Sequence, residues 1–165
     1  FKLIFDIDDR GSSKLISLNV SNKNLKKVIE NFNEQFYLSS VTENTFYGIY
    51  SNSNRPGEIA TISNGSLNKL SEFNELILAQ YSLGDTTEIN YEAPDGTPIQ
   101  GWYITPPDFD KSKKYPLILV IHGGPHAMYR PSFNYLWHQF ASDGYVVLYT
   151  NPRGSTGYGL SLIHI

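Results

Sequence analysis

The sequence contains no cysteine, which excludes disulfide bridges and thiolate metal sites. This absence fits a reducing compartment and favours the cytoplasm without fixing the location. An excess of basic charge is also lacking: 13 Lys and Arg residues face 16 Asp and Glu residues, for a formal net charge of -3. A nucleic-acid partner therefore has no electrostatic support. No apolar run approaches the roughly 20 residues that cross a bilayer, so a membrane-spanning segment is not expected.

Neither end of the chain looks like a natural terminus. The sequence opens without Met or a leader, inside the strand-like run from Lys2 to Ile7. A natural start there would leave an unpaired strand edge, so we interpret residue 1 as a truncation and targeting information as missing. Residues 160–165 are interpreted as non-native read-through of a sequencing adapter, whose end they match on back-translation. The alternative is a short apolar strand, which genomic DNA encoding these residues in frame would support.

The first half of the chain contains an internal repeat. Leu25, Lys27 and Val28 follow Ser-Asn at 21–22 and recur 42 residues later as Leu67, Lys69 and Leu70 after Ser-Asn at 63–64. A period of about 40–45 residues made of short strands is typical of β-propeller blades. Short β-rich segments separated by turn residues support this, at 15–20, 37–41, 45–50 and 58–63. Residues 1–75 are therefore predicted to form two propeller blades, the last of their propeller.

Two hairpin turns and an acidic cluster are the other notable features of this half. Arg10-Gly11-Ser12-Ser13 and Asn64-Gly65-Ser66 lie where hairpin turns are expected. Asp6, Asp8 and Asp9 form an acidic cluster that could suggest a metal site. They lack the spacing and the twelfth-position Glu of a calcium loop, so we interpret them as a strand that runs into a polar turn.

The second half changes character near Glu75. Strands are predicted at 87–92, 99–104, 117–121 and 145–149, and a helix at about 132–142, which Asp143-Gly144 would end. Residues 117–121 are continuously apolar, which predicts a strand buried on both faces of a largely parallel sheet. The order strand, loop, helix, strand is that of the opening of an α/β sheet.

A glycine-rich loop, His122-Gly123-Gly124-Pro125-His126, follows the predicted strand at 117–121. In α/β-hydrolases a loop at this place supplies one backbone N–H to the oxyanion hole. Glycine lets the backbone approach a substrate carbonyl without a Cβ in the way. One such donor stabilises the transition state by about 3–4 kcal/mol. The alternative is a Gly-Pro turn without chemistry.

A second glycine-rich loop, residues 151–159, follows the next strand. It has neither the Lys-Ser/Thr ending of a phosphate loop nor G-x-G-x-x-G spacing, so phosphate binding is not supported. Arg153 is interpreted as a brace of this loop rather than as a carboxylate-binding group. No metal or cofactor site is predicted.

The two loops together resemble the prolyl oligopeptidase family of serine peptidases. The forms His-Gly-Gly-Pro-His and Asn-Pro-Arg-Gly-Ser-Thr-Gly-Tyr-Gly are most similar to its acylaminoacyl-peptidase and dipeptidyl-peptidase 5-like branch. The turn at 95–96, the strand at 101–102 and the segment Arg-Pro-Gly-Glu at 55–58 fit the same pattern. The resemblance implies a mixed fold, with propeller blades over residues 1–75 and the N-terminal part of an α/β-hydrolase domain over residues 76–159.

The resemblance also assigns site residues. Gly124 would donate the oxyanion-hole N–H, while Gly123 and His122 would shape the loop. The family's nucleophilic serine elbow, Asp and His lie further along the chain and have no counterpart here, because no Gly-x-Ser-x-Gly occurs. Ser66 and Ser155 are interpreted as turn residues. The chain is therefore expected to carry part of a peptidase that acts on short peptides through an acyl-enzyme, and to be inactive by itself.

Two alternatives remain open at this point. A carboxylesterase of the α/β-hydrolase type also uses a His-Gly-Gly loop, but simple esterases lack a propeller. A non-catalytic, propeller-based binding protein would lack the serine elbow downstream. The expected partner is a peptide substrate, with neither nucleic acid nor membrane, and the oligomeric state is left open.

Overall fold

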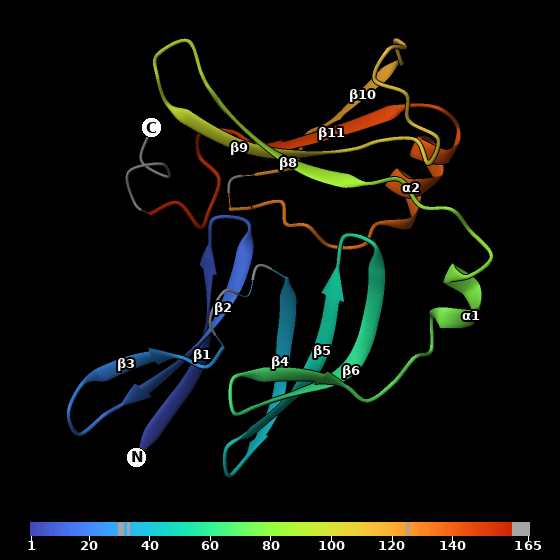
Figure 1. Ribbon diagram of the computed structural model, residues 1–165. Coiled ribbons are helices and arrows are strands. Elements are labelled where there is room, and N and C mark those ends of the chain that lie inside the picture. Colours follow the sequence, from blue (N-terminus) through green and yellow to red (C-terminus); the bar gives the residue numbers. More distant parts are fainter. Residues whose placement is uncertain (30–31, 33, 125, 160–165) are drawn as a thin grey trace.

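The computed structural model describes residues 1–29, 32, 34–124 and 126–159 (Figure 1). The adapter interpretation of residues 160–165, and Pro125 of the glycine-rich loop, lie outside this part of the chain. The described elements run in the order β1 (Lys2–Asp9), β2 (Ser12–Asn19), β3 (Asn24–Lys27), β4 (Gln35–Thr42), β5 (Thr45–Asn52), β6 (Arg55–Ser63), β7 (Ser66–Lys69), α1 (Glu75–Leu78), β8 (Thr86–Glu92), β9 (Pro98–Ile104), β10 (Leu117–Val120), α2 (Tyr135–Ser142) and β11 (Val146–Asn151).

The strands form three sheets. The first is an antiparallel meander in the order β1-β2-β3, and the second is an antiparallel meander in the order β4-β5-β6-β7. The third has the order β10-β11-β9-β8, in which only β10 and β11 are parallel. Figure 1 shows the first two sheets side by side, with the tip of the β1–β2 hairpin directed toward the third sheet.

The internal repeat falls on matching places of the first two sheets. Shifted by 42 residues, β3 coincides with β7, the outer strand of each sheet. The predicted turns are also confirmed. Arg10 and Gly11 have φ of 46° and 72°, and Asn64 and Gly65 have φ of 51° and 76°. Two consecutive positive φ values are those of a tight hairpin turn that matches the strand twist.

Two separate apolar clusters hold the sheets. The first lies within the first two sheets and consists of Leu15, Phe32, Phe36, Tyr50, Ala60 and Ile62. The second lies between the third sheet and α2 and consists of Trp102, Ile104, Trp137, Ala141, Val147 and Tyr149. The strand segments that supply these residues alternate buried and exposed positions, as sheets with one covered face require.

The third sheet corrects the prediction for residues 117–121. They were expected to be buried on both faces of a largely parallel sheet, but Leu117 and Leu119 are 57% and 53% exposed. Among the described strands, β10 has a neighbour on one side only and is an edge strand. The apolar composition of β10 suits a buried strand, but composition does not determine how many strands pair with it. The sheet is mixed, because β9 runs antiparallel to both of its neighbours.

Helix α2 begins three residues later than its predicted start. Asn134 caps it, and its side-chain Oδ1 accepts a hydrogen bond from Trp137 N at 3.2 Å. Asn at this position satisfies an amide that has no partner within the helix. The predicted end is confirmed, since Asp143 is the last capping residue and Gly144 follows with φ of 91°.

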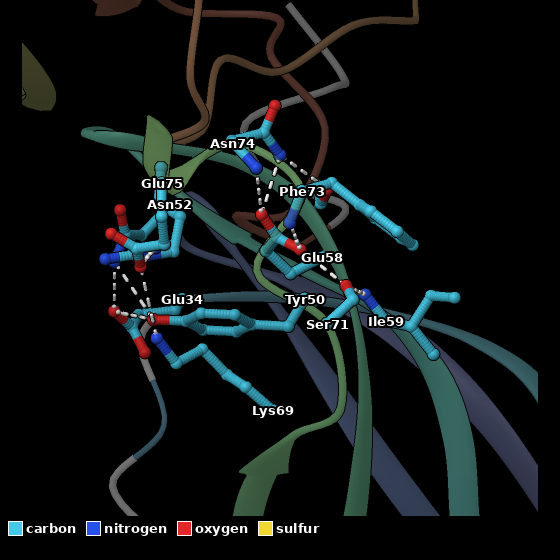
Figure 2. Close-up of polar contacts among 12 residues, drawn as sticks. Glu34, Tyr50, Asn52, Glu58, Ile59, Lys69, Ser71, Phe73, Asn74 and Glu75 are labelled. Carbon is cyan, nitrogen blue, oxygen red and sulfur yellow. Dashed lines mark hydrogen bonds and ion pairs between the residues drawn. The ribbon is translucent and has the colours of Figure 1, made fainter. Parts of the chain in front are cut away.

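A buried carboxylate ties the second sheet to the segment after it (Figure 2). Glu58, 1% exposed, accepts hydrogen bonds from Ser71 Oγ at 2.5 Å and Phe73 N at 3.0 Å. Asn74 donates to the same carboxylate from its backbone N at 2.9 Å and from Nδ2 at 2.8 Å. Burial by itself would raise the pKa of Glu58, but these donors lower it to about 2. The charged form is therefore the one that the fold holds.

A histidine of α2 contacts the second sheet. His138 is 4% exposed, and its Nε2 lies 2.7 Å from the carbonyl oxygen of Ser53, in the turn between β5 and β6. A carbonyl only accepts, so Nε2 carries the proton. Burial lowers the pKa of His138, and the bond to Ser53 opposes that shift. The ring is thus held neutral, stacked on Phe133 with ring centroids 5.0 Å apart.

Replacing Glu58 by Gln is expected to lower the free energy of unfolding by about 2 kcal/mol, because an amide cannot accept all four hydrogen bonds. The stability that the charged carboxylate contributes is present above its ordinary pKa of 4.5 and is lost as pH falls toward 2. Urea unfolding at several pH values measures both effects. Glu72→Gln is the matched control, since Glu72 is exposed in the same segment. Equal stability of the two variants would contradict this role of Glu58.

The neutral state of His138 predicts a second pH range in which acidification destabilises the fold. Because its pKa is lowered from 6.5, its contribution is complete above pH 6.5 and is lost as pH falls below that value. His138→Gln keeps a side-chain donor near Ser53 but cannot titrate. The fall in melting temperature between pH 7 and pH 5 should be smaller in this variant than in the wild type. His126→Gln, at an exposed histidine, should leave the slope unchanged. The idea is wrong if H138Q keeps the wild-type slope.

Candidate functional site

The segment between β10 and α2 begins with the first glycine-rich loop, and the whole segment is called the first loop from here on. It places the predicted site residues at the surface. Gly123 and Gly124 are exposed, and a Cβ built on either would meet no atom within 4 Å. Within the described part of the chain, neither of their amides donates a hydrogen bond. Because no group of the described chain engages these two adjacent exposed amides, they can donate to an acceptor that approaches this open face.

The His122 side chain turns inward and is fixed at both ring nitrogens. Nδ1 lies 2.7 Å from the carbonyl oxygen of Gly123, and Nε2 lies 2.9 Å from Ser155 Oγ. The carbonyl only accepts, so Nδ1 carries a proton. Nε2 and Ser155 Oγ lie within hydrogen-bonding distance, while the hydroxyl proton of Ser155 is donated to the carbonyl oxygen of Pro152 at 2.7 Å. The ring also meets Tyr129 edge-on, with centroids 5.1 Å apart.

Ser155 has the geometry of a structural residue. It is fully buried, its N donates to the carbonyl of Pro152 at 3.1 Å, and its Oγ lies 2.7 Å from the same oxygen. A Ser–His pair at 2.9 Å resembles a nucleophile and its base. Here the hydroxyl is enclosed and lies between two partners, so it links the two glycine-rich loops. The neighbouring Thr156 N donates to Ala127 O at 3.0 Å and joins the loops a second time.

Asn151, the last residue of β11, forms hydrogen bonds with both loops. Its side chain is completely buried, and Oδ1 accepts from Tyr129 N at 2.7 Å. Its Nδ2 donates to Tyr129 O at 3.0 Å and to the Tyr158 hydroxyl at 2.8 Å. The Tyr158 hydroxyl donates in turn to Gln100 Oε1 at 2.5 Å. One amide thus fixes the backbone of the first loop and a side chain of the second.

Aromatic rings pack beneath this polar layer. Tyr149 contacts Trp102, Trp137 and Tyr129, with centroids 5.6, 4.5 and 5.5 Å apart. These distances lie in the range of favourable aromatic pairs. The Tyr149 hydroxyl is buried without a partner among the described residues, and burial raises its pKa, so the phenol stays neutral. The two loops therefore rest on a rigid apolar base.

Arg153 braces its loop, as the sequence predicted. Its guanidinium donates to Asp95 Oδ2, and to Thr97 Oγ1 at 3.1 Å, in the turn between β8 and β9. The ion pair between Arg153 and Asp95 lies at the surface. Arg153 thus does contact a carboxylate, but one that belongs to the chain itself. In the described part of the chain, no three His, Asp or Glu side chains are grouped so that they could hold a metal ion.

Sequence reasoning missed the residues that hold the site together. Asn151, Tyr158 and Tyr129 were not singled out, and Ser155 was interpreted only as a turn residue. Asn151, two residues after the predicted strand at 145–149, was the one available signal, since Asn side chains commonly bond backbone groups where an element ends. Which backbone it would reach depends on the pairing of β11 with β9, which places it beside Gln100.

Sequence comparison relates the chain to peptidases. Uncharacterized peptidase YuxL of Bacillus subtilis is 36% identical over 132 residues, which cover 79% of this chain and 19% of that protein. A probable dipeptidyl-peptidase 5 of Aspergillus niger is 43% identical over 107 residues, which cover 62% of this chain and 15% of that protein. No family model matches the chain. The chain spans less than a fifth of the length of these two relatives.

Solved structures agree. Pyrococcus horikoshii acylaminoacyl peptidase superposes with a TM-score of 0.83 at 26% identity, covering 98% of this chain and 25% of that one. An acylaminoacyl peptidase in complex with Z-Gly-Gly-Phe-chloromethyl ketone gives a TM-score of 0.84 at 27% identity, with the same coverage. Porphyromonas gingivalis dipeptidyl peptidase 4 shares the fold, with a TM-score of 0.79 at 19% identity.

These matches define the chain first as a relative of peptidases with a largely β fold. More specifically, the chain belongs with the prolyl oligopeptidase family, on the side of acylaminoacyl peptidase and dipeptidyl-peptidase 5. The resemblance seen in the two glycine-rich loops is thereby confirmed. Within the described residues, no helix is both long and apolar enough to cross a membrane.

Ser155→Ala is expected to loosen the first glycine-rich loop. The variant removes the hydroxyl at His122 Nε2, and the loss of this buried hydrogen bond should cost about 1 kcal/mol. Amide hydrogen exchange at Thr156 and Tyr129, whose N–H groups bond to Ala127 O and Asn151 Oδ1, should become faster, while that of β5 and β6 stays unchanged. Nitrogen-15 NMR of the His122 ring should show a proton on Nδ1 in the wild-type protein. Ser66→Ala, at an exposed serine, is the control. Unchanged exchange in S155A would rule out this link between the loops.

Proposed function

We propose that the chain is part of a serine peptidase that hydrolyses short peptides through an acyl-enzyme, and that it supplies one side of the oxyanion hole. In this proposal the Gly124 N–H donates to the developing oxyanion, while Gly123 and His122 shape the loop. The nucleophilic serine, the Asp and the His of the triad lie outside these 165 residues. The observation that carries the proposal is the pair of free amides of Gly123 and Gly124 at the end of β10.

The geometry of the loop supports this role. An oxyanion donor must be unpaired in the resting protein and must not reorganise when charge develops. The Gly124 amide is free, while the residues around it are fixed through His122, Ser155 and Asn151. Catalysis would then proceed by attack of the serine oxygen on the peptide carbonyl as the triad His takes the hydroxyl proton, and the electron pair of the C=O bond would move onto the oxygen that receives the Gly124 hydrogen bond. Collapse of this intermediate would break the C–N bond, and the amine would leave with the proton from the His.

The same proposal includes the architecture. Residues 1–75 would be two blades of a β-propeller, and residues 76–159 the opening of an α/β-hydrolase domain. The four-stranded antiparallel meander of β4 to β7, the repeat shared by β3 and β7, and the two separate apolar clusters support this division. A carboxylesterase without a propeller accounts for none of these features. The acylaminoacyl peptidase captured with a peptidyl chloromethyl ketone supports a peptide substrate.

The chain of 165 residues should not react with a serine-directed fluorophosphonate probe. Ser155 is buried and hydrogen-bonded, and an oxyanion loop without a nucleophile and base gives little acceleration. The full-length gene product should react, and should cleave aminoacyl-nitroanilides in preference to acyl-nitrophenols. Gel fluorescence and a side-by-side rate assay measure these outcomes. Labelling of the 165-residue chain would overturn the placement of the nucleophile outside it.

Gly124→Ala in the full-length protein should lower kcat/KM for aminoacyl-nitroanilides by about 10- to 100-fold, because the new Cβ displaces the substrate carbonyl from the donor. The melting temperature should stay within a degree or two of wild type, since the added methyl meets no atom of the chain. Gly123→Ala is the neighbouring comparison and should have the smaller effect. An activity of G124A equal to that of the wild type would contradict the assignment of the donor.

A further inference from the structure

We propose that the tip of the β1–β2 hairpin is a positioning element for the oxyanion loop through Asp8, Arg10 and Gly11, with Asp8 as its main charged contact. This inference rests on the proposed function, and it concerns residues of the first sheet that are more than 110 positions away from the loop in sequence. The tip lies against both glycine-rich loops, as Figure 1 shows for the hairpin and the segment that joins β10 to α2.

An ion pair makes the first contact. Arg130 Nη2 donates to Asp8 Oδ1 at 2.6 Å, with side-chain exposures of 22% and 40%. Arg130 directly follows Tyr129, whose backbone N and O are both bound by Asn151. The ion pair therefore acts on the segment that is fixed on its other side by the third sheet. A short charged hydrogen bond of this kind has a defined direction as well as a favourable energy.

Backbone groups of the turn make the next contacts. Arg10 N donates to Gly157 O at 3.0 Å, in the second loop. Gly11 N donates to Met128 Sδ at 3.3 Å, in the first loop. The conformation with positive φ at Arg10 and Gly11 turns both of these amides away from the hairpin's own ladder. One tight turn thus bonds to both loops at once.

Close packing links Met128 to the turn and to the second loop. A Cβ on Gly157 would lie 2.4 Å from Met128 Sδ, and a Cβ on Gly11 would lie 2.4 Å from Trp102 Cη2. Met128 is therefore enclosed between the turn and the second loop, while Trp102 covers the turn from the third sheet. Because these two contacts are close, a shift of the hairpin toward the loops would move Met128 and Tyr129, and with them the loop that begins at His122.

The chemical consequence concerns the transition state rather than substrate affinity. A displacement of the Gly124 amide by a fraction of an ångström weakens a hydrogen bond to the oxyanion but leaves peptide binding elsewhere unchanged. Asp8 and Arg130 touch no reacting atom in this scheme and act through the loop. The expected signature is a lower kcat with an unchanged KM.

The test compares three variants of the full-length protein: Asp8→Asn, the charge exchange Asp8→Arg with Arg130→Asp, and Asp9→Asn. Asp9 is the matched control, because it is the adjacent carboxylate of the same hairpin and forms no ion pair with a described residue. In D8N, kcat for an aminoacyl-nitroanilide should fall about fivefold with KM within twofold, and the exchanged pair should recover at least half of the loss. D9N should match the wild type.

Hydrogen exchange gives a second readout that does not need activity. D8N should speed exchange of the hydrogen-bonded amides of Tyr129 and Thr156 and leave β5 and β6 at the wild-type rate, whereas D9N should change neither. Equal exchange and equal kcat in D8N and D9N would overturn the positioning role, as would a loss that the exchanged pair does not recover. A wild-type protein that neither cleaves peptides nor reacts with the fluorophosphonate probe would contradict the proposed function instead. In that case the hydrogen-exchange comparison of D8N and D9N would still test whether the hairpin positions the loop.

Discussion

The buried amide of Asn151 is the interaction on which the site depends. An amide enclosed at the end of a strand must have its hydrogen bonds satisfied, because each buried group left unpaired costs about 1–3 kcal/mol. Asn151 satisfies them with the backbone of Tyr129 and the hydroxyl of Tyr158. Since both partners belong to loops, the requirement of one side chain determines the conformation of two segments. Glycine-rich loops without such an anchor would have many accessible conformations.

Polar contacts also determine how the sheets are arranged. The two apolar clusters share no residue, and hydrogen bonds cross between the parts that contain them: Arg130 to Asp8, Arg10 to Gly157, and His138 to Ser53. Apolar packing is non-directional, whereas each of these bonds defines an orientation. The arrangement is therefore specific, and it includes a buried imidazole, His138, that is held neutral.

Sequence patterns identified the elements that have strong local signals. The strands at 45–50, 58–63 and 99–104 and the end of α2 at Gly144 were predicted because β-rich runs and glycine caps are local features. The short strands β3 and β7 were missed as strands, since Asn-Leu-Lys-Lys and Ser-Leu-Asn-Lys have little β propensity. They pair because the preceding turns set their register, and the 42-residue repeat was the signal that marked them.

The candidate site was predictable in its loop but not in its supports. His122 to Gly124 carry a recognisable pattern, whereas Ser155, Asn151 and Asp8 acquire their roles only through contacts over 20 to more than 100 residues of chain. The structure adds a further distinction among polar groups. Both ring nitrogens of His122 and both backbone groups of Tyr129 have partners, while the amides of Gly123 and Gly124 have none within the described chain. Free donors inside an otherwise fixed loop cannot relax toward internal partners, and this is the condition under which a backbone amide can meet a developing negative charge without reorganising.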